Sequence, residues 1–255
     1  MNLIFQRRLL QTHKLGFMPN QTFVFKQFVI NQNKCAMKVG TDAVLLGAWV
    51  NVNDAKNILD IGTGTGVLAL MLAQKSNADI DAIDIDENSC IQAKENIELS
   101  FWKNRINIIH SSAQTYSETC SKKYDLVISN PPYFESSTKA LGEKRTMARH
   151  NDMLPYCELL SSVLNLLDKK GKFCVILPFK EAEQLREMAG SKKLFLTKMT
   201  RVKTRADKTT DKRLLMQFEF EQKSFSENSI TIEKDGRHDY SEEYKELTKD
   251  YYLAF

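Results

Sequence analysis

Residues 57–74 read NILDIGTGTGVLALMLAQ, and this stretch decides the fold. Its first five residues have the apolar pattern of a buried strand, and its last eight, VLALMLAQ, form an apolar helical run. Gly62, Gly64 and Gly66 lie between the two and allow backbone amides to approach a ligand closely at the helix N-terminus. A generic tight turn is the alternative interpretation of these glycines. The stretch predicts a strand, a turn and a helix, with a candidate ligand site at the turn.

From about residue 42 onward, short apolar runs alternate with helical stretches, which indicates a parallel sheet with crossover helices. Further strands are predicted at 80–85, 106–110, 124–129 and 172–177, and further helices at 87–99, 153–167 and 181–188. The last two predicted strands, at 194–202 and 214–220, have no helical pattern between them and indicate an antiparallel hairpin at the sheet edge. The predicted fold class is α/β and Rossmann-like: a mostly parallel seven-stranded sheet with an antiparallel C-terminal hairpin and helices on both faces. Ligands of such sheets bind beyond the carboxyl ends of the strands.

The composition excludes several classes of protein. The chain has 255 residues, of which 42% are hydrophobic, and no apolar run approaches the roughly 18 residues of a membrane span. The five cysteines are widely spaced without any Cys-x-x-Cys pair, and the four histidines are scattered, so no metal site is expected. Unpaired thiols suit a reducing compartment, and we expect a cytoplasmic protein without a membrane partner. Residues 1–17 are a possible dispensable extension, and residues 18–255 are predicted to form a single domain.

The net charge of +4 hides an uneven distribution. Residues 1–41 carry six basic residues and no acid, and residues 192–217 carry nine basic residues and two acids. From residue 218 to the end, ten acidic residues face five basic ones. Such segregation is typical of a protein that presents a basic face to a polyanion, but ordinary solvated surfaces explain it equally well.

Acidic residues at two strand ends indicate the cofactor. Asp60 precedes the glycines and would repel a pyrophosphate, while Val67 stands where the dinucleotide fingerprint requires Gly or Ala. An acid at this position suits a ligand with positive charge, such as the ammonium and sulfonium of S-adenosylmethionine (SAM). Asp84 follows Gly62 by 22 residues, close to the offset of about 20 at which an acid binds ribose, and Asp86 could share that role. The sequence favours SAM over NAD.

The tetrapeptide Asn130-Pro131-Pro132-Tyr133 follows the predicted strand at 124–129 and is the candidate catalytic motif. Two prolines remove amide donors and force an extended backbone, which leaves the Pro131 carbonyl free to accept a hydrogen bond. The side-chain oxygen of Asn130 is a second acceptor, and Tyr133 can stack on a planar ring. Two acceptors beside a ring form a site for an exocyclic –NH2 group, whose lone pair they can direct at a methyl donor. A rigid turn is the alternative.

These motifs resemble those of class I SAM-dependent N-methyltransferases with an Asn-Pro-Pro-Tyr motif, and more narrowly the bacterial tRNA1(Val) (adenine37-N6)-methyltransferase family. The resemblance covers about residues 22–255 and rests on FKQF at 25–28, CAMKVGTD at 35–42, residues 59–74, the tetrapeptide at 130–133 and a Tyr-rich tail. It implies that Lys38, Thr41 and Asp42 help to close over SAM, and that the substrate is an adenine beside a tRNA anticodon. Related enzymes often place an Asp on the SAM adenine where this chain has Ser112, whose hydroxyl can still accept a hydrogen bond.

The substrate contacts are less specific in the sequence. Phe23, Phe25 and Lys26 could line the entrance for an unpaired RNA strand, or they could form an aromatic edge packed on the core. Arg149 is a candidate phosphate contact, and so are Arg201 and Arg205 of the basic segment; each could equally be solvated.

Three other functions remain open at this stage. Release-factor glutamine N5-methyltransferases resemble the chain at the tetrapeptide but carry a helical domain before the sheet, for which about 40 residues leave little room. DNA adenine methylation would need a target-recognition domain that we do not find. A non-catalytic RNA-binding protein with the same fold would have no need for both Asn130 and Tyr133. The sequence indicates neither which tRNA is modified nor an oligomeric state.

Overall fold

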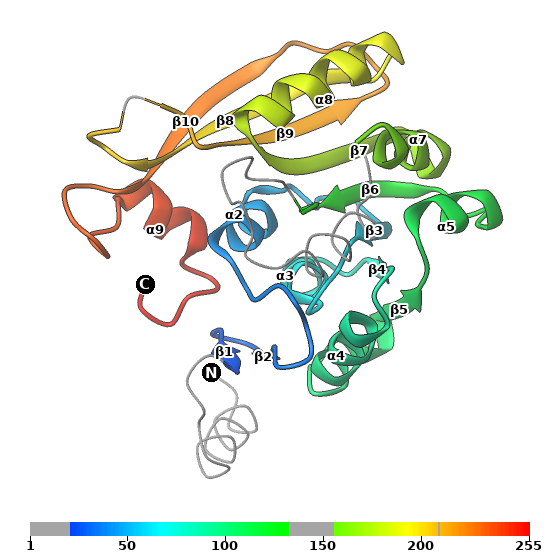
Figure 1. The fold of residues 1–255 in the computed structure, drawn as a ribbon, viewed down its shortest axis with the longest axis horizontal. Helices are drawn as coiled ribbons and strands as arrows, with labels where there is room; N and C mark the ends of the chain where they lie inside the picture. Colours follow the sequence, from blue (N-terminus) through cyan, green and yellow to red (C-terminus); the bar gives the residue numbers. More distant parts are fainter. Residues whose placement is uncertain (1–20, 133–155, 209) are drawn as a thin grey trace, which may run out of the picture.

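A computed structural model describes residues 21–132, 156–208 and 210–255 (Figure 1). The predicted extension at 1–17, Tyr133, Arg149 and the start of the predicted helix at 153–167 lie outside the described residues.

An eight-stranded sheet forms the centre of the molecule, in the order β10-β8-β9-β7-β6-β3-β4-β5. Its strands are β3 (Asn57–Ile61), β4 (Asp79–Asp84), β5 (Ile106–His110), β6 (Tyr124–Ser129), β7 (Leu167–Pro178), β8 (Phe195–Arg205), β9 (Arg213–Glu219) and β10 (Ser226–Glu233). β3 pairs in parallel with β4 and β6, and the parallel pairing continues from β4 to β5 and from β6 to β7. Only β9 runs against its neighbours, pairing antiparallel with β7 and β8.

The seven predicted strands and the antiparallel pairing of the last two are confirmed, but this hairpin is not at the sheet edge as predicted, because an unpredicted eighth strand, β10, lies outside it. β10 pairs in parallel with β8 and has the sequence SENSITIE, in which only Ile230 is buried. A polar edge strand with one solvated face carries little hydrophobic signal, so periodicity did not reveal it. β7 also begins five residues earlier than predicted, because Leu167 pairs with Tyr124 before the register shifts.

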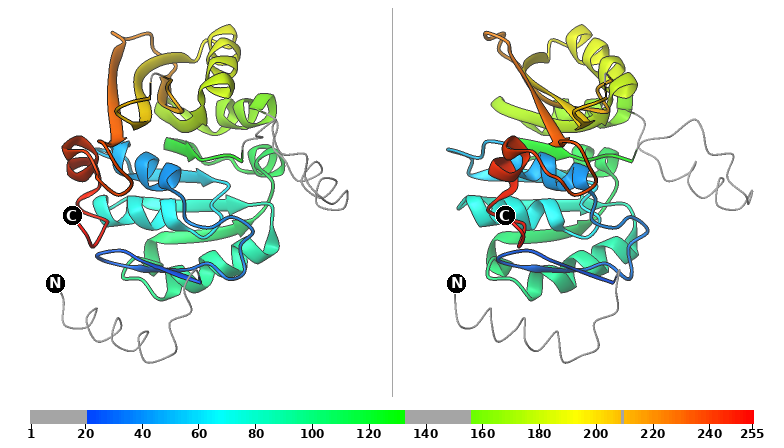
Figure 2. Two further views of the ribbon diagram at one scale, coloured as in Figure 1. Left: turned by 60° about the vertical axis from the view of Figure 1, so that its left-hand side comes forward. Right: turned by 90° about the vertical axis from the view of Figure 1, so that its left-hand side faces the viewer.

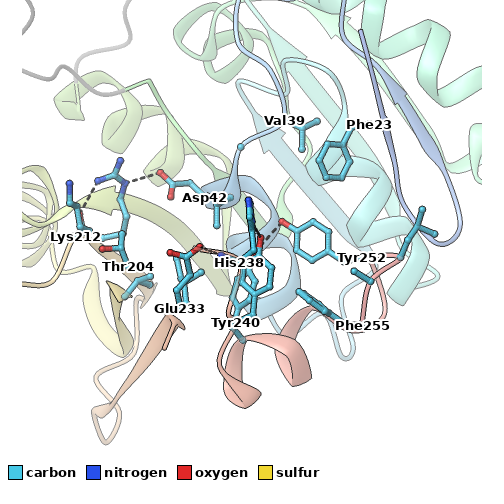
Figure 3. Close-up of a pocket in the computed structure, with 18 of the residues that line it drawn as sticks. Phe23, Val39, Asp42, Thr204, Lys212, Glu233, His238, Tyr240, Tyr252 and Phe255 are labelled. Atoms are coloured by element: carbon cyan, nitrogen blue, oxygen red, sulfur yellow. Dashed lines mark hydrogen bonds and ion pairs between the residues drawn. The ribbon is translucent and has the colours of Figure 1, made fainter. Parts of the chain in front are cut away.

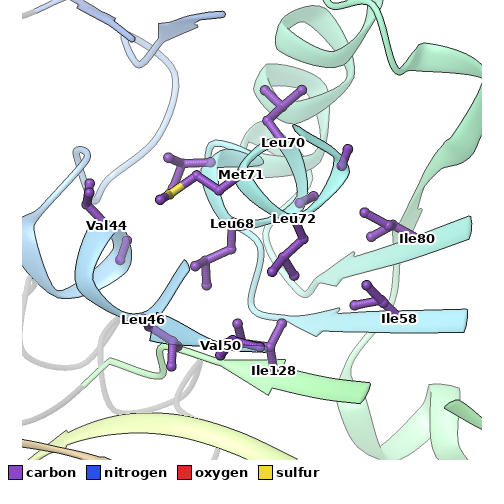
Figure 4. Packing of buried hydrophobic residues seen from close by; sticks show 14 of the residues in the cluster. Val44, Leu46, Val50, Ile58, Leu68, Leu70, Met71, Leu72, Ile80 and Ile128 are labelled. Atoms are coloured by element: carbon purple, nitrogen blue, oxygen red, sulfur yellow. The ribbon is translucent and has the colours of Figure 1, made fainter. Parts of the chain in front are cut away.

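Helices cover both faces of the sheet, as predicted (Figure 2). One face packs α2 (Thr41–Trp49), α3 (Val67–Lys75), α4 (Glu87–Glu98) and α9 (Glu242–Thr248), and the other packs α5 (Ala113–Thr119), α7 (Tyr156–Leu166) and α8 (Phe179–Ser191). α3 is apolar all round, and its residues Val67 to Ala73 are all buried, because the sheet, α2 beside it and the C-terminal segment all pack against it (Figure 4). A short 3-10 turn, η1 (Lys103–Arg105), precedes β5.

A two-stranded hairpin, β1 (Thr22–Val24) and β2 (Val29–Asn31), lies beside the C-terminal segment, which is red in Figures 1 and 2. The Lys26 amide donates to the Tyr251 carbonyl at 2.8 Å, and the Phe25 ring stacks between Phe28 and Tyr252. The two ends of the described chain are therefore tied together.

Candidate functional site

The candidate site lies at the carboxyl edge of the sheet, where β3, β4, β5 and β6 end in the glycine loop, Asp84, Ser112 and Asn130. The N-terminus of α2 reaches the same edge. α3 leaves the carboxyl end of β3, and its last residue, Lys75, donates to the Ala48 and Val50 carbonyls at the end of α2. The two helices therefore run side by side in the same direction, and both begin at this edge.

The three glycines of the loop adopt left-handed backbone conformations, with φ of +76° at Gly62, +54° at Gly64 and +80° at Gly66. A Cβ atom at Gly62 or Gly64 would meet no atom within 4 Å, whereas one at Gly66 would lie 3.3 Å from the Ala93 Cβ. The first two glycines therefore border open space, and the third lets α3 and α4 approach each other.

The sequence predicted that the amides of the glycine loop approach a ligand, but four of these amides donate to acceptors within the protein. The Gly62 and Thr63 amides both donate to the Ile83 carbonyl, at 2.9 and 3.0 Å. The Gly64 amide donates to Asp84 Oδ2 at 2.7 Å, and the Gly66 amide donates to the Thr63 carbonyl at 2.9 Å. These four amides are therefore unavailable to a ligand. The glycines instead allow the left-handed backbone of the turn and leave open space beside Gly62 and Gly64. This use of donors is a further argument against a pyrophosphate ligand, which needs such amides free.

Asp60 is fully buried at the end of β3, with an exposure of 0%. Thr63 Oγ1 donates to its Oδ2 at 2.7 Å, while its Oδ1 has no hydrogen-bond partner among the described residues. Burial disfavours the charged form and raises the pKa of Asp60 from 3.8 to about 7, against the lowering effect of the Thr63 hydrogen bond. A buried acceptor without a partner is costly, so this oxygen indicates a missing donor or cation.

The two acids near the end of β4 have different tasks. Asp84 accepts from the Gly64 amide through Oδ2 and from the Asp86 amide through Oδ1, the latter at 2.9 Å. Burial raises the pKa of Asp84. Asp86 instead caps α4, accepting from the Ser89 amide at 2.8 Å and from the Ser89 hydroxyl at 2.7 Å. Asp84 lies against the glycine loop, whereas Asp86 lies at the start of α4, so Asp84 is the better candidate for a ligand contact.

Ser112 is the N-cap of α5. Its hydroxyl oxygen accepts from the Thr115 amide at 3.0 Å, and its hydrogen can be donated to Thr115 Oγ1 at 2.9 Å. Sequence reasoning missed its neighbour at this end of the site, Ile85, which is 49% exposed directly after Asp84. The Ile85 carbonyl bonds to His110 Nε2 at 2.9 Å. An exposed apolar side chain beside Asp84 suits the flat face of a purine, and its position after the acid was the available signal.

Asn130 follows β6, between β3 and β7. Its Oδ1 is buried and has no hydrogen-bond partner among the described residues. The strand below it is fixed, because Ser129 Oγ donates to the Ile61 carbonyl at 2.9 Å. Pro131 is buried and Pro132 is exposed, whereas Tyr133, the last residue of the motif, lies outside the described residues. The structure thus holds an unused acceptor at the position predicted to be catalytic.

The segment predicted to close over the cofactor is held from two sides. Asp42, in the first turn of α2, accepts from Arg213 Nε at 2.8 Å, which ties the helix to the start of β9. The Val39 amide donates to Gln32 Oε1 at 2.9 Å, while Lys38 and Thr41 are exposed. Sequence reasoning did not identify Arg213 as the partner of Asp42, since the two are far apart in the chain.

Asn96 also escaped the sequence analysis. It is buried on α4, where its Nδ2 donates to the Thr65 carbonyl of the glycine loop at 2.8 Å and to the Asn31 carbonyl at 2.9 Å. Its Oδ1 accepts from the Asn31 amide at 2.8 Å. This side chain positions the loop against β2, and an amide on the inner face of an amphipathic helix was the signal for it.

The predicted substrate contacts are not gathered at the site. Phe25 has an exposure of 0% and lies in the aromatic edge packed on the core, so it offers no surface to an RNA base, contrary to the prediction. The ammonium of Lys26 is bonded to the carbonyls of Lys249 and Phe255. Packing of the tail on the hairpin explains both placements.

The arginines of the basic segment are paired with acids. Arg201 binds Asp211 at 3.0 Å and also Glu227, and Arg205 binds Asp207. Arg149, the remaining predicted phosphate contact, lies outside the described residues. The excess of cations in the sequence therefore overstates the positive charge available to a polyanion.

Among the described residues, no group of three or more His, Cys, Asp or Glu side chains is placed to hold a metal ion. No helix in the described ranges is both long and apolar enough to cross a membrane.

The chain is similar to known methyltransferases. Residues 35–176 match the family model described as Methyltransferase small domain. The tRNA1(Val) (adenine(37)-N6)-methyltransferase of Trichodesmium erythraeum is 46% identical over 241 residues, which is 93% of this chain and 100% of that protein. The chain belongs to the tRNA1(Val) (adenine(37)-N6)-methyltransferase family. A second member, from Bacteroides thetaiotaomicron, is 47% identical over 92% of this chain and 99% of its own length.

Solved structures agree on the fold. A predicted O-methyltransferase, Atu636 from Agrobacterium tumefaciens, superposes with a TM-score of 0.66 at 16% identity, over 82% of this chain and 96% of its own. A methyltransferase from Pyrococcus furiosus gives a TM-score of 0.52 at 19% identity, over 85% and 98% of the two chains. The tRNA1(Val) (adenine(37)-N6)-methyltransferase family resemblance and the class I fold predicted from the sequence are both confirmed.

Proposed function

We propose that this protein transfers a methyl group from SAM to the N6 amine of an adenine in tRNA, at position 37 of tRNA1(Val), the nucleotide named for its relatives. The observation that carries the proposal is the buried Asn130 Oδ1 at the carboxyl end of β6, beside the glycine loop of β3, which has no partner in the described part of the chain. An acceptor kept without a partner at this edge suits an –NH2 group that arrives with the substrate. We also propose that residues 18–255 act as one methyltransferase domain.

The cofactor side of the site fits SAM. Asp60 offers an unpartnered oxygen to positive charge, Asp84 offers acceptors for ribose hydroxyls, and the space beside Gly62 and Gly64 is open. Ile85 presents an apolar surface for the adenine, next to the hydroxyl of Ser112. When bound, SAM supplies an electrophilic methyl group on its sulfonium.

The protein's own contribution to the reaction is positioning. The amine of adenine delocalises its lone pair into the ring and is a poor nucleophile. Asn130 Oδ1 and the Pro131 carbonyl accept hydrogen bonds from this amine and hold it so that the lone pair can point at the methyl donor, with Tyr133 proposed to stack on the ring. The methylated nitrogen would be cationic and strongly acidic and would release one proton to water, so no separate strong base is needed. Most of the rate enhancement then comes from orientation and electrostatics.

Methylation of tRNA from a strain that lacks the modification tests the function. With labelled SAM, we expect the label in tRNA, in an adenine carrying one methyl group on N6 next to the anticodon. Mapping the modified nucleotide by mass spectrometry of nuclease fragments checks both the tRNA and the position. Label that appears only in a protein, such as a release factor, would overturn the RNA assignment.

The affinity for SAM is expected to rise with pH through neutrality because of Asp60. Its pKa of about 7 means that the carboxyl is largely neutral at pH 6 and largely ionised at pH 8 in the ligand-free protein. The cationic ligand favours the ionised form, so the Kd should fall by about 10-fold across this range. Calorimetric titration at several pH values measures it.

The matched control is Asp60→Asn, which keeps the shape of the side chain and removes its titration. This variant should bind SAM weakly and with a flatter pH dependence, and the dependence that remains would come from Asp84. A wild-type Kd that does not change between pH 6 and pH 8 would contradict the role of Asp60.

A further inference from the structure

A cavity of about 710 Å³ opens at the carboxyl edge of the sheet, next to the start of α2 (Figure 3). Its wall includes Gly40, Thr41 and Asp42 at the start of α2, the ends of β8 and β10, and the C-terminal residues after α9. Ligand pockets commonly measure roughly 300–1,000 Å³, so this one is large enough for a nucleoside. Of the residues predicted to bind the cofactor, Thr41 and Asp42 line this cavity, whereas those of the glycine loop and of the ends of β4 and β5 do not.

Strand pairing places this cavity on the substrate side of Asn130. β7 runs parallel to β6, and its last residue, Pro178, lies opposite Arg213 at the start of β9. Arg213 in turn lies opposite Val202 near the end of β8, and Arg205 lies opposite Glu233 at the end of β10. All these positions are at the edge where β6 ends. In the strand order, β3 and β4 with their acids lie on one side of β6, and the cavity lies on the other.

The cavity is rich in aromatic rings that come from distant parts of the chain. Phe23 belongs to β1, Tyr240 precedes α9, and Tyr252 and Phe255 belong to the C-terminal segment (Figure 3). All four rings are only partly buried. Tyr240 stacks on the buried Tyr244 with ring centroids 5.3 Å apart, and Phe255 meets Tyr240 edge-on at 5.1 Å. The rings are therefore held in place and still present surface to an incoming planar group.

The charges of the cavity favour a nucleotide that enters with its phosphate at one side. Lys212 lines the cavity and is exposed, and its ammonium has no ion-pair partner in the described part of the chain. Arg213, next to it, is engaged by Asp42. The acid of the wall, Glu233, accepts from the His238 amide at 2.8 Å and lies on the β10 side. Aromatic rings beside an unpaired cation are the combination by which proteins bind single-stranded nucleic acid.

We propose that this cavity binds the base of a nucleotide adjacent to the target adenine, so that the enzyme holds two unstacked bases of the RNA loop. The inference rests on the proposed function, because it takes the substrate to be RNA. The target amine reaches Asn130, and the neighbouring base stacks among Tyr240, Tyr252 and Phe255 with its phosphate near Lys212. The enzyme should therefore prefer an RNA loop to a duplex, because unstacking a second base of a paired strand costs free energy.

A double-mutant cycle, which combines one protein substitution with one RNA change and measures the affinity of each combination, tests the proposal. The probe is a labelled RNA hairpin with the anticodon-loop sequence of tRNA1(Val), intact or with an abasic nucleotide on one or the other side of the target adenine. Stacking of one base is worth about 1–3 kcal/mol, so we expect one abasic hairpin to bind wild-type protein about 10-fold more weakly. Tyr240→Leu should weaken binding of the intact hairpin by a similar factor. The two changes together should cost little more than either alone, because they remove the same contact. Fluorescence anisotropy measures each Kd.

The control variant is Phe225→Ala, which removes a more exposed ring, 48% accessible, just before β10 at the opposite edge of the sheet. It should bind all hairpins as the wild type does. If Tyr240→Leu does not retain SAM affinity and a normal thermal transition, Phe255→Leu at the end of the chain replaces it in the cycle. Losses that multiply in the double change, or abasic hairpins that bind as well as the intact one, would overturn the proposal.

Methyl transfer to the intact hairpin is measured separately and tests the proposed function. Transfer without coupling between the ring and the base would leave the enzyme assignment in place and remove the second base site. Coupling without transfer would support the base site and refute the reaction. Absence of any RNA binding would overturn both.

Discussion

Replacing Asn130 with alanine is expected to lower kcat about 1,000-fold, because comparable single groups that organise a transition state contribute 100- to 1,000-fold. The change removes one of the two acceptors that we propose hold the adenine amine, while the glycine loop and Asp84 are untouched. The Kd for SAM should therefore stay within about 2-fold of the wild-type value, since no cofactor contact is lost. Single-turnover methylation of tRNA with excess enzyme, together with calorimetric titration of SAM, measures the two quantities.

Asn107→Ala provides the matched control for this substitution. Asn107 lies in β5, where its Nδ2 donates to Asp81 Oδ1 at 3.2 Å, away from the carboxyl edge of the sheet. Losing this exposed amide should leave the methylation rate nearly unchanged. If Asn130→Ala keeps wild-type turnover, the unpartnered oxygen has no part in the reaction, and the argument for an amine substrate fails with it. The variant is expected to fold, because the acceptor that it removes has no hydrogen-bond partner among the described residues.

Much of the fold was predictable because its signals are local. The apolar run at 57–61, the glycines after it and the apolar helix at 67–75 follow one another in the chain, and each has a period or a composition of its own. The antiparallel pairing of β9 with β8 was also predictable, because the sequence between the two strands has no helical pattern. β10 was missed because its residues are polar on an exposed edge, and its pairing with β8 depends on backbone groups that composition does not reveal.

The site was predictable only where a residue acts through its place at a strand end. Asp60, Asp84 and Asn130 are of this kind: the local sequence placed them at strand ends, where the structure has them, while their roles stay predictions. The partners of charged groups are different, because they depend on which segments meet in space. Arg201 and Arg205 looked available to RNA until the structure placed Asp211, Glu227 and Asp207 beside them. A count of charges along a chain cannot separate a paired cation from a free one.

Asp84→Ala should raise the Kd for SAM about 100-fold, whereas Asp86→Ala should change it less than about 3-fold. Asp84 is the side chain that reaches the site from the end of β4, and a carboxylate that binds hydroxyl groups contributes about 1.5–3 kcal/mol for a charged hydrogen bond. The same substitution also removes the acceptor of the Gly64 amide, so that the loop loses one of its fixed points. Titration calorimetry of both variants measures the difference.

Asp86→Ala is the matched control for Asp84→Ala, because it also removes an acid near the end of β4 together with the hydrogen bonds that this acid accepts. Loss of the α4 cap, which receives the Ser89 amide and hydroxyl, should lower the free energy of unfolding by about 1 kcal/mol. Chemical denaturation should therefore detect Asp86→Ala while SAM titration hardly does. If the two variants lose SAM affinity equally, the capping acid also contacts the cofactor, and the division of tasks at the end of β4 is wrong.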